Sequence, residues 1–183
     1  MFVGGDARAS SQRETRMALI REVRESDAEG FLELCSRLDE ETQFMLLEPG
    51  ERLTTGEEQL ERIRHLLSRD NQTVLVAEHG DRLVGYLEAL GGEYKRDRHS
   101  AHIVAGILRE FAGRGIGTQL FDEVQDWARR RSIHRLELTV MAHNSRAIGL
   151  YRKMGFEIEG TRRDSLFVND RYVDEFYMAK LLP

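Results

Sequence analysis

The chain has 183 residues, of which 40% are hydrophobic and 32% are charged, and its formal net charge is −5 at pH 7. This length and composition are typical of one soluble globular domain. The acidic balance argues against general nucleic-acid binding, and no apolar run reaches the roughly 18 residues that a membrane span needs. We therefore expect neither a nucleic acid nor a membrane as a partner.

Residues 1–16 are polar and lack the apolar stretch of a secretory signal, so we expect a flexible leader there and one domain over 17–183. The single cysteine, Cys35, excludes an intramolecular disulfide and favours a reducing, cytoplasmic location. Cys35 shares a helical stripe with Phe31 and Leu38, which indicates a core thiol rather than a catalytic one.

The hydrophobic patterns predict one mixed α/β domain. The elements expected in its first half are a strand over 17–23, a helix that starts at a capping box over 26–29, a helix capped by Thr55, a strand over 73–77, a turn over 79–81 and a strand over 83–90. The second half should contain a central strand over 101–108, a helix over 115–130, a strand over 135–140, a helix over 144–154 ended by Gly155, and strands over 156–160 and 172–181.

The segment from Ala112 to Gly117 reads Ala-Gly-Arg-Gly-Ile-Gly and joins the central strand to a helix. The first N–H groups of a helix have no intrahelical acceptor, the helix dipole adds partial positive charge, and glycines let an anion approach the backbone. Arg114 adds a charged side chain, and Arg109 is a second source of charge. The segment alone leaves two interpretations open, namely a phosphate site and a tight turn that needs small residues.

Two other phosphate-binding motifs are excluded by spacing. No Lys-Ser or Lys-Thr pair follows the glycines, so the segment is not a P-loop. The dinucleotide motif G-x-G-x-x-G would need a third glycine where the chain has Leu120 or Thr118. A nucleotide-binding oxidoreductase is therefore not expected.

A second informative segment runs from Asn144 to Phe156. Asn144 and Tyr151 are seven residues apart, so on a helix they share a face and lie about 10 Å apart along the axis. One interpretation is a helix face that lines an extended cofactor arm, with the amide on the arm and the phenol at its reactive end. The alternatives are that Asn144 only caps the helix and that Tyr151 is a core aromatic beside Ala147 and Met154.

With these two segments in place, residues 99–160 resemble the GCN5-related N-acetyltransferase (GNAT) superfamily. The superfamily's Q/R-x-x-G-x-G/A signature aligns with 112–117, and its N-x-x-A-x-x-L-Y-x-x-x-G-F block aligns with 144–156 without a gap. The resemblance implies a single-domain GNAT fold, an α/β (α+β) architecture with a mixed, mostly antiparallel sheet of about seven strands flanked by about four helices.

The resemblance also implies an enzyme that moves an acetyl group from acetyl-CoA to a primary amine by direct attack, without a metal. The acceptor would be a small-molecule amine, a polyamine or a protein N-terminus. The tail from Val168 to Met178 is loosely similar to the branch that acetylates polyamines and ribosomal-protein N-termini. A homodimer is possible on this fold. A non-catalytic acyl-CoA-binding or regulatory module is the alternative function.

For the cofactor, the resemblance implies a site that spans the strand end, the glycine segment and the second helix. The residues expected to bind acetyl-CoA are Ile107, Leu108, Ala112, Gly113, Arg114, Gly115, Ile116, Gly117 and Asn144. Ala112 departs from the signature, which has Gln or Arg at this position. One side-chain contact to the pyrophosphate is therefore missing, and Arg109 or Arg114 is expected to compensate.

For catalysis, the resemblance implies that Tyr151 protonates the leaving thiolate. A primary amine is mostly protonated at neutral pH, so a base is also expected, and His102 on the central strand is the candidate. Glu88 and Glu137 are rivals, and His102 is alternatively an ordinary histidine. Residues 99 and 102 lie on opposite faces of a strand, so two histidines there do not form a metal site. Glu40-Glu41 either lines an acceptor pocket or lies in a solvated loop.

Overall fold

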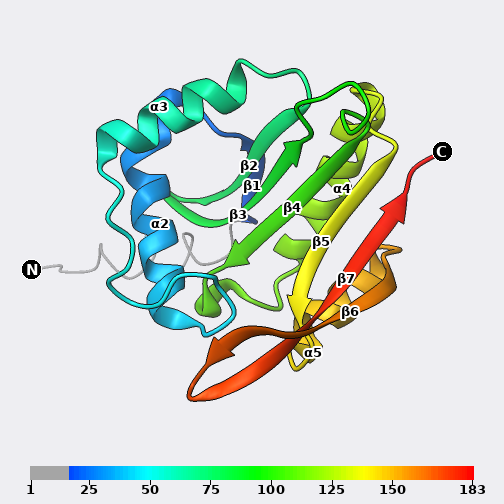
Figure 1. Ribbon diagram of the computed structural model, residues 1–183. Coiled ribbons are helices and arrows are strands. Elements are labelled where there is room, and N and C mark those ends of the chain that lie inside the picture. The colour runs from blue at the N-terminus through cyan, green and yellow to red at the C-terminus, as the bar shows by residue number, and fades with distance from the viewer. Residues whose placement is uncertain (1–16) are drawn as a thin grey trace, which may run out of the picture.

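The computed structural model describes residues 17–183, so the predicted leader lies outside the described residues. A seven-stranded sheet with the order β1-β2-β3-β4-β5-β7-β6 forms its centre. Helices α2 and α3 cover one face of this sheet, and α4 and α5 cover the other (Figure 1). Every strand pairing is antiparallel except that of β4 with β5. The predicted mixed, mostly antiparallel α/β architecture is therefore confirmed.

The elements follow the predicted order along the chain. The strands are β1 (Leu19–Glu22), β2 (Gln72–His79), β3 (Arg82–Gly91), β4 (Ser100–Ile107), β5 (Arg135–Met141), β6 (Glu157–Val168) and β7 (Arg171–Leu181). The helices are α2 (Ala28–Glu41), α3 (Gly56–Leu67), α4 (Ile116–Arg130) and α5 (Ser145–Lys153), with short 3-10 turns η1 (Glu25–Asp27) and η2 (Arg109–Phe111). Within residues 17–183, no helix is long and apolar enough to cross a membrane.

The start of α2 differs from the prediction, whereas the start of α3 agrees with it. No capping box forms over 26–29; instead the Asp27 carboxylate accepts from the Arg24 backbone N–H at 2.7 Å and from the Arg21 guanidinium at 2.6 Å. The sequence pattern predicted the capping box in the wrong place because Arg21 of the preceding strand binds the Asp27 carboxylate. At α3, the Thr55 hydroxyl accepts from the Glu58 N–H at 3.2 Å, and the Glu58 carboxylate accepts from the Thr55 N–H at 2.8 Å.

Strand β6 is much longer than the predicted 156–160. Its second half contains Arg162, Arg163 and Asp164, lies mostly exposed, and carries no alternation of polar and apolar residues. This half is held as an edge strand by pairing with β7, with a register shift between Arg162 and Leu166. The strand therefore depends on its partner rather than on its own hydrophobicity, which is why the sequence pattern missed it.

The two faces of the central sheet are built by alternate residues of β4. A Cβ on Gly106 would lie 2.7 Å from the Leu38 side chain of α2, whereas the Ile107 side chain lies beside Gly117 of α4. The predicted core thiol is confirmed, because Cys35 is 6% exposed on the α2 side. Burial raises the pKa of the Cys35 thiol to about 11, so this thiol stays protonated at neutral pH.

Strands β4 and β5 separate part of the way along their length. Their parallel pairing covers Ser100 with Arg135, Ala101 with Leu136, and His102 with Glu137, and it goes no further. From that point the two strands diverge toward their carboxyl ends (Figure 1). The sheet therefore contains an opening whose closed end lies at His102 and Glu137.

The turn from β4 into α4 requires glycine at two positions. Gly113 and Gly115 both have a φ of 82°, in the left-handed region, and Gly115 is the N-cap of α4. An L-residue in this region has its Cβ close to a carbonyl oxygen. Part of the glycine pattern is thus explained by backbone geometry alone.

A glycine-to-alanine substitution should have opposite effects at two sites. We expect Gly115→Ala to lower the free energy of unfolding by about 1–2 kcal/mol because of the positive φ. Gly149→Ala, inside α5 where a Cβ meets nothing within 4 Å, should raise it by about 0.5–1 kcal/mol. Urea unfolding of both variants measures the difference. Equal effects at the two sites would show that the turn tolerates an ordinary residue.

Candidate functional site

The glycine turn presents a continuous row of free backbone donors. Among the described residues, the N–H groups from Gly113 to Thr118 have no hydrogen-bond acceptor, and the next one, on Gln119, donates to the Gly115 carbonyl at 3.1 Å. The first turn of α4 contains no acidic residue. Free N–H groups at the positive end of a fifteen-residue helix are arranged to bind an anion such as a phosphate.

Three cationic side chains surround this row. The Arg114 guanidinium lies 5.0 Å from the centre of the Phe111 ring. A Cβ on Gly113 would lie 3.5 Å from Arg146 Nη2, and Lys153 Nζ donates to Thr118 Oγ1 at 3.2 Å. Sequence reasoning missed Arg146 and Lys153, although both lie on the helix that carries Asn144 and Tyr151, and that shared helix was the available signal.

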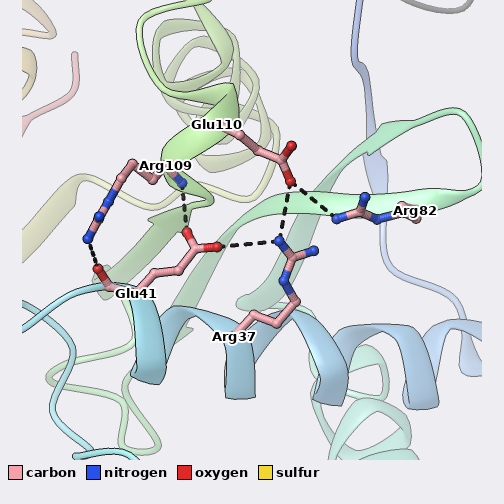
Figure 2. Close-up of polar contacts among 5 residues, drawn as sticks. All are labelled: Arg37, Glu41, Arg82, Arg109 and Glu110. Atoms are coloured by element: carbon pink, nitrogen blue, oxygen red, sulfur yellow. Dashed lines mark hydrogen bonds and ion pairs between the residues drawn. The ribbon is translucent and has the colours of Figure 1, made fainter.

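Arg109 cannot compensate for Ala112, because its polar groups are directed at the end of α2. The Arg109 backbone N–H donates to Glu41 Oε2 at 2.9 Å, and its guanidinium donates to the Glu41 carbonyl (Figure 2). Arg37 lies between Glu41 and Glu110, at 3.3 and 3.2 Å, and Arg82 is 3.3 Å from Glu110. Of the two arginines expected to compensate, Arg109 is thus engaged by α2 and Arg114 remains, and Glu41 anchors the glycine turn to α2 instead of lying in a solvated loop.

Beside the opening, β4 offers free backbone groups. The Leu108 N–H donates to the Val84 carbonyl at 3.0 Å, on the β3 side. Because neighbouring residues of a strand point their polar groups in opposite directions, those of Ala105 and Ile107 face the opening toward β5. Leu108 thus has no free N–H for a ligand, which corrects the expectation for that residue, and Ala105 joins Ile107 as a donor position.

Asn144 is the N-cap of α5. Its side-chain Oδ1 accepts from the Ala147 N–H at 3.2 Å. The capping interpretation is confirmed, and the amide Nδ2 is left to donate elsewhere. The same residue can therefore start the helix and contact a ligand.

Tyr151 of α5 lies against the aromatic core. Its ring centre is 5.4 Å from that of Phe121 and 6.2 Å from that of Phe156. Burial raises the pKa of the phenol to about 12, so Tyr151 is protonated throughout the neutral range. Packing and function do not exclude each other here, because the packing holds the phenol in its acidic, proton-donating form.

The three candidate bases lie on the α2 face of the sheet. His102 shares a face with Gly106, which contacts α2, and the register places Glu137 beside His102 and Glu88 diagonally across from it. Glu137 forms an ion pair with Arg135 at 2.6 Å, and Glu88 forms one with Arg62 at 2.5 Å. Among the side chains that the structure describes, none makes a hydrogen bond or ion pair with His102.

The loop between α2 and α3 reaches the carboxyl end of the opening. Gln43 Oε1 accepts from Asn169 Nδ2 of the β6–β7 turn at 2.8 Å. The Phe44 ring lies 5.3 Å from the His143 ring, which precedes α5. Segments far apart in the sequence therefore meet at this end of the opening.

Curated acetyltransferases share significant sequence similarity with the chain, including the following two. It is 34% identical over 120 residues to the L-amino acid N-acetyltransferase AaaT of Escherichia coli, covering 63% of this chain and 72% of that protein. It is 27% identical over 112 residues to the spermidine N(1)-acetyltransferase of Vibrio cholerae, covering 61% and 64%. The predicted similarity to the polyamine branch is confirmed by the second relative.

Solved structures show the same architecture. A GNAT-family acetyltransferase from Streptococcus pneumoniae superposes with a TM-score of 0.87 at 32% identity, over 91% of this chain and 99% of that one. The acetyltransferase yncA from Salmonella typhimurium, solved with acetyl-CoA, has a TM-score of 0.81 at 19% identity and covers 92% and 95%. The expected single-domain GNAT fold is confirmed.

The family model described as "Acetyltransferase (GNAT) family" matches residues 32–156, from the middle of α2 through the whole of α5. This match includes the strand divergence, the glycine turn and the Asn144–Tyr151 helix. The chain therefore belongs to the acetyltransferase (GNAT) family and is an acyltransferase.

Proposed function

We propose that this chain transfers an acetyl group from acetyl-CoA to a primary amine by direct attack. The observation that supports this most strongly is the opening between β4 and β5, which lies next to the free N–H row of 113–118. The opening suits an extended, amide-bearing arm, and the N–H row suits a pyrophosphate. Cys35, a single buried thiol, fits our placement of the reaction in the reducing cytoplasm.

The pyrophosphate would bind to the backbone N–H groups of Gly113, Gly115, Ile116 and Gly117. Arg114 and Arg146 would supply the side-chain charge that Ala112 lacks, and Lys153 would add a third positive charge. Arginine is suited to this role because its guanidinium can make two parallel hydrogen bonds to one phosphate. The loss at Ala112 would thus be offset by Arg114 and by the cations of α5 rather than by Arg109.

The acetyl-bearing arm would lie in the opening. Its amides would pair with the polar groups of Ala105 and Ile107, with the Asn144 amide as a further donor. A strand N–H directed at the thioester oxygen would also stabilise the negative charge that develops there during attack. Catalysis by this route needs no metal.

Proton transfer would use two residues on opposite sides of the reacting carbon. His102 would remove the proton from the acceptor ammonium, since the rival carboxylates Glu88 and Glu137 are each engaged by an arginine. Tyr151 would protonate the leaving thiolate, and a phenol with its pKa raised to about 12 holds that proton at every pH at which the enzyme works.

The alternative is a module that binds acyl-CoA without turnover. The buried, protonated phenol of Tyr151 favours the enzyme, because binding alone would not need a proton donor. The relatives' names frame the choice of acceptor as one between an amino acid and a polyamine.

Replacing Tyr151 by phenylalanine tests the enzyme and its acid together. We expect wild type to release free thiol from acetyl-CoA with at least one amine of a panel, and Tyr151→Phe to lower kcat about 100-fold or more with little change in KM. Tyr94→Phe, at a side chain 73% exposed between β3 and β4, is the matched control. Because the Tyr151 pKa is raised, wild-type kcat should show no loss from phenol ionisation below about pH 11. Acetyl-CoA binding without thiol release from any amine would favour the module.

The base is tested by the pH dependence of kcat/KM. Wild-type activity should fall as the pH is lowered, because a protonated imidazole cannot accept the ammonium proton. His102→Gln should be slower and should lose that acidic limb, whereas Glu137→Gln, one strand away, should keep it. An unchanged profile in His102→Gln, or a lost limb in Glu137→Gln, would assign the base elsewhere.

A further inference from the structure

The buried carboxylates of this protein all have an arginine partner. Asp39, Glu88 and Glu175 are the buried aspartate and glutamate side chains within residues 17–183. Their nearest guanidinium nitrogens belong to Arg52 at 2.6 Å, Arg62 at 2.5 Å and Arg162 at 3.6 Å. A polycation binds best to carboxylates without a partner, so these three pairs do not favour a polyamine.

Arg62 differs from Arg52 in its greater exposure and from Arg162 in its pairing with a carboxylate diagonally across from His102. Arg52 is bound by both oxygens of Asp39 and its side chain is 19% exposed, whereas the Arg62 side chain is 44% exposed. Arg162 contacts Glu175, which is paired with Met141, four residues along β5 from Glu137 and so about 13 Å away. Arg62 is therefore the arginine best placed to bind an anion beside His102.

The position of Glu88 explains how Arg62 is held there. Glu88 lies on β3, diagonally across from His102, and one of its buried oxygens, Oε1, forms no hydrogen bond of good geometry although Arg62 Nη2 is close. A guanidinium held at one nitrogen by a buried carboxylate keeps its remaining N–H groups for another acceptor. Glu88 is thus a positioning residue for Arg62.

We propose that Arg62 binds the carboxylate of the acceptor, so that the enzyme prefers zwitterionic α-amino acids to polyamines and to other amines without a carboxylate. This proposal rests on the acetyltransferase function proposed above. The acceptor amine would lie at His102 and its carboxylate at Arg62, with Glu88 keeping the guanidinium in place. A free amino acid has both charges within a few ångströms of each other, whereas spermidine presents only positive ones.

Matched acceptors provide the first test. Wild-type kcat/KM would be measured by thiol release for L-ornithine and putrescine, for L-phenylalanine and phenethylamine, for L-alanine and L-alaninamide, and for spermidine. Charge-assisted hydrogen bonds to the carboxylate should make kcat/KM for the better amino acids about 10- to 100-fold higher than for the matched amines without a carboxylate. A higher kcat/KM for spermidine, or for the amines without a carboxylate, would overturn the proposal. The acetyltransferase function would stand in that case.

Substitutions at Arg62 provide the second test. Arg62→Gln should raise KM for the preferred amino acid about tenfold or more, with little change in kcat and no change for its carboxylate-free partner. Arg64→Gln is the matched control, since Arg64 lies on the same helix and pairs with Glu25 and Glu61 at the surface. Removing Arg62 leaves Glu88 as a buried unpaired charge, so the double variant Arg62→Gln with Glu88→Gln separates lost binding from lost stability.

The outcomes distinguish the proposed amino-acid preference from the acetyltransferase function on which it rests. A rise in KM confined to amino acids, in both the single and the double variant, supports carboxylate binding by Arg62. An equal loss for amino acids and for plain amines shows a merely structural role and overturns it. Absence of thiol release with every acceptor, while acetyl-CoA still binds, overturns both the acetyltransferase and the amino-acid preference.

Discussion

The end of the parallel pairing between β4 and β5 is the feature on which the rest of the site depends. Up to His102 and Glu137 the backbone groups of the two strands bond to each other, and beyond that point they do not. A gap in a sheet leaves polar groups without partners, at a cost comparable to that of lost hydrogen bonds. A ligand with amides of its own removes this cost on binding. The opening therefore favours binding of an extended, peptide-like arm. Ala105 and Ile107 would contribute to this binding through their backbone groups rather than through their side chains.

The glycine turn adds the second half of the ligand's requirements at the end of the same strand. Left-handed Gly113 and Gly115 direct a row of N–H groups outward, and α5 brings Arg146 and Lys153 to the same place. The network of Arg37, Glu41 and Arg109 in Figure 2 anchors the turn to α2, which leads into the loop that contacts the β6–β7 turn. Each exposed ion pair contributes little alone. Their joint effect is to give the glycine turn and the loop after α2 one common support.

Much of this was predictable from local patterns, and the exceptions share a cause. The Ala112–Gly117 turn, the α5 cap at Asn144 and the order of the elements follow from spacing that a single segment contains. The second half of β6, the role of Asp27 at α2 and the direction of Arg109 depend on partners far away in the sequence, which no local pattern reports. The same holds for Glu88 and Arg62, whose pairing joins β3 to α3 and could not be inferred from either segment. Tertiary contacts decided these positions.

We propose above all that acetyl-CoA binds in the β4–β5 opening and on the glycine turn. Amide hydrogen exchange with and without acetyl-CoA tests this binding residue by residue, because the amides of Ala105, Ile107 and 113–118 are free without ligand. We predict that acetyl-CoA slows exchange at Ala105, at Ile107 and from Gly113 to Thr118, and leaves the exposed edge strand β6 unchanged. Slowed exchange confined to other segments, or none at the glycine turn, would contradict the account.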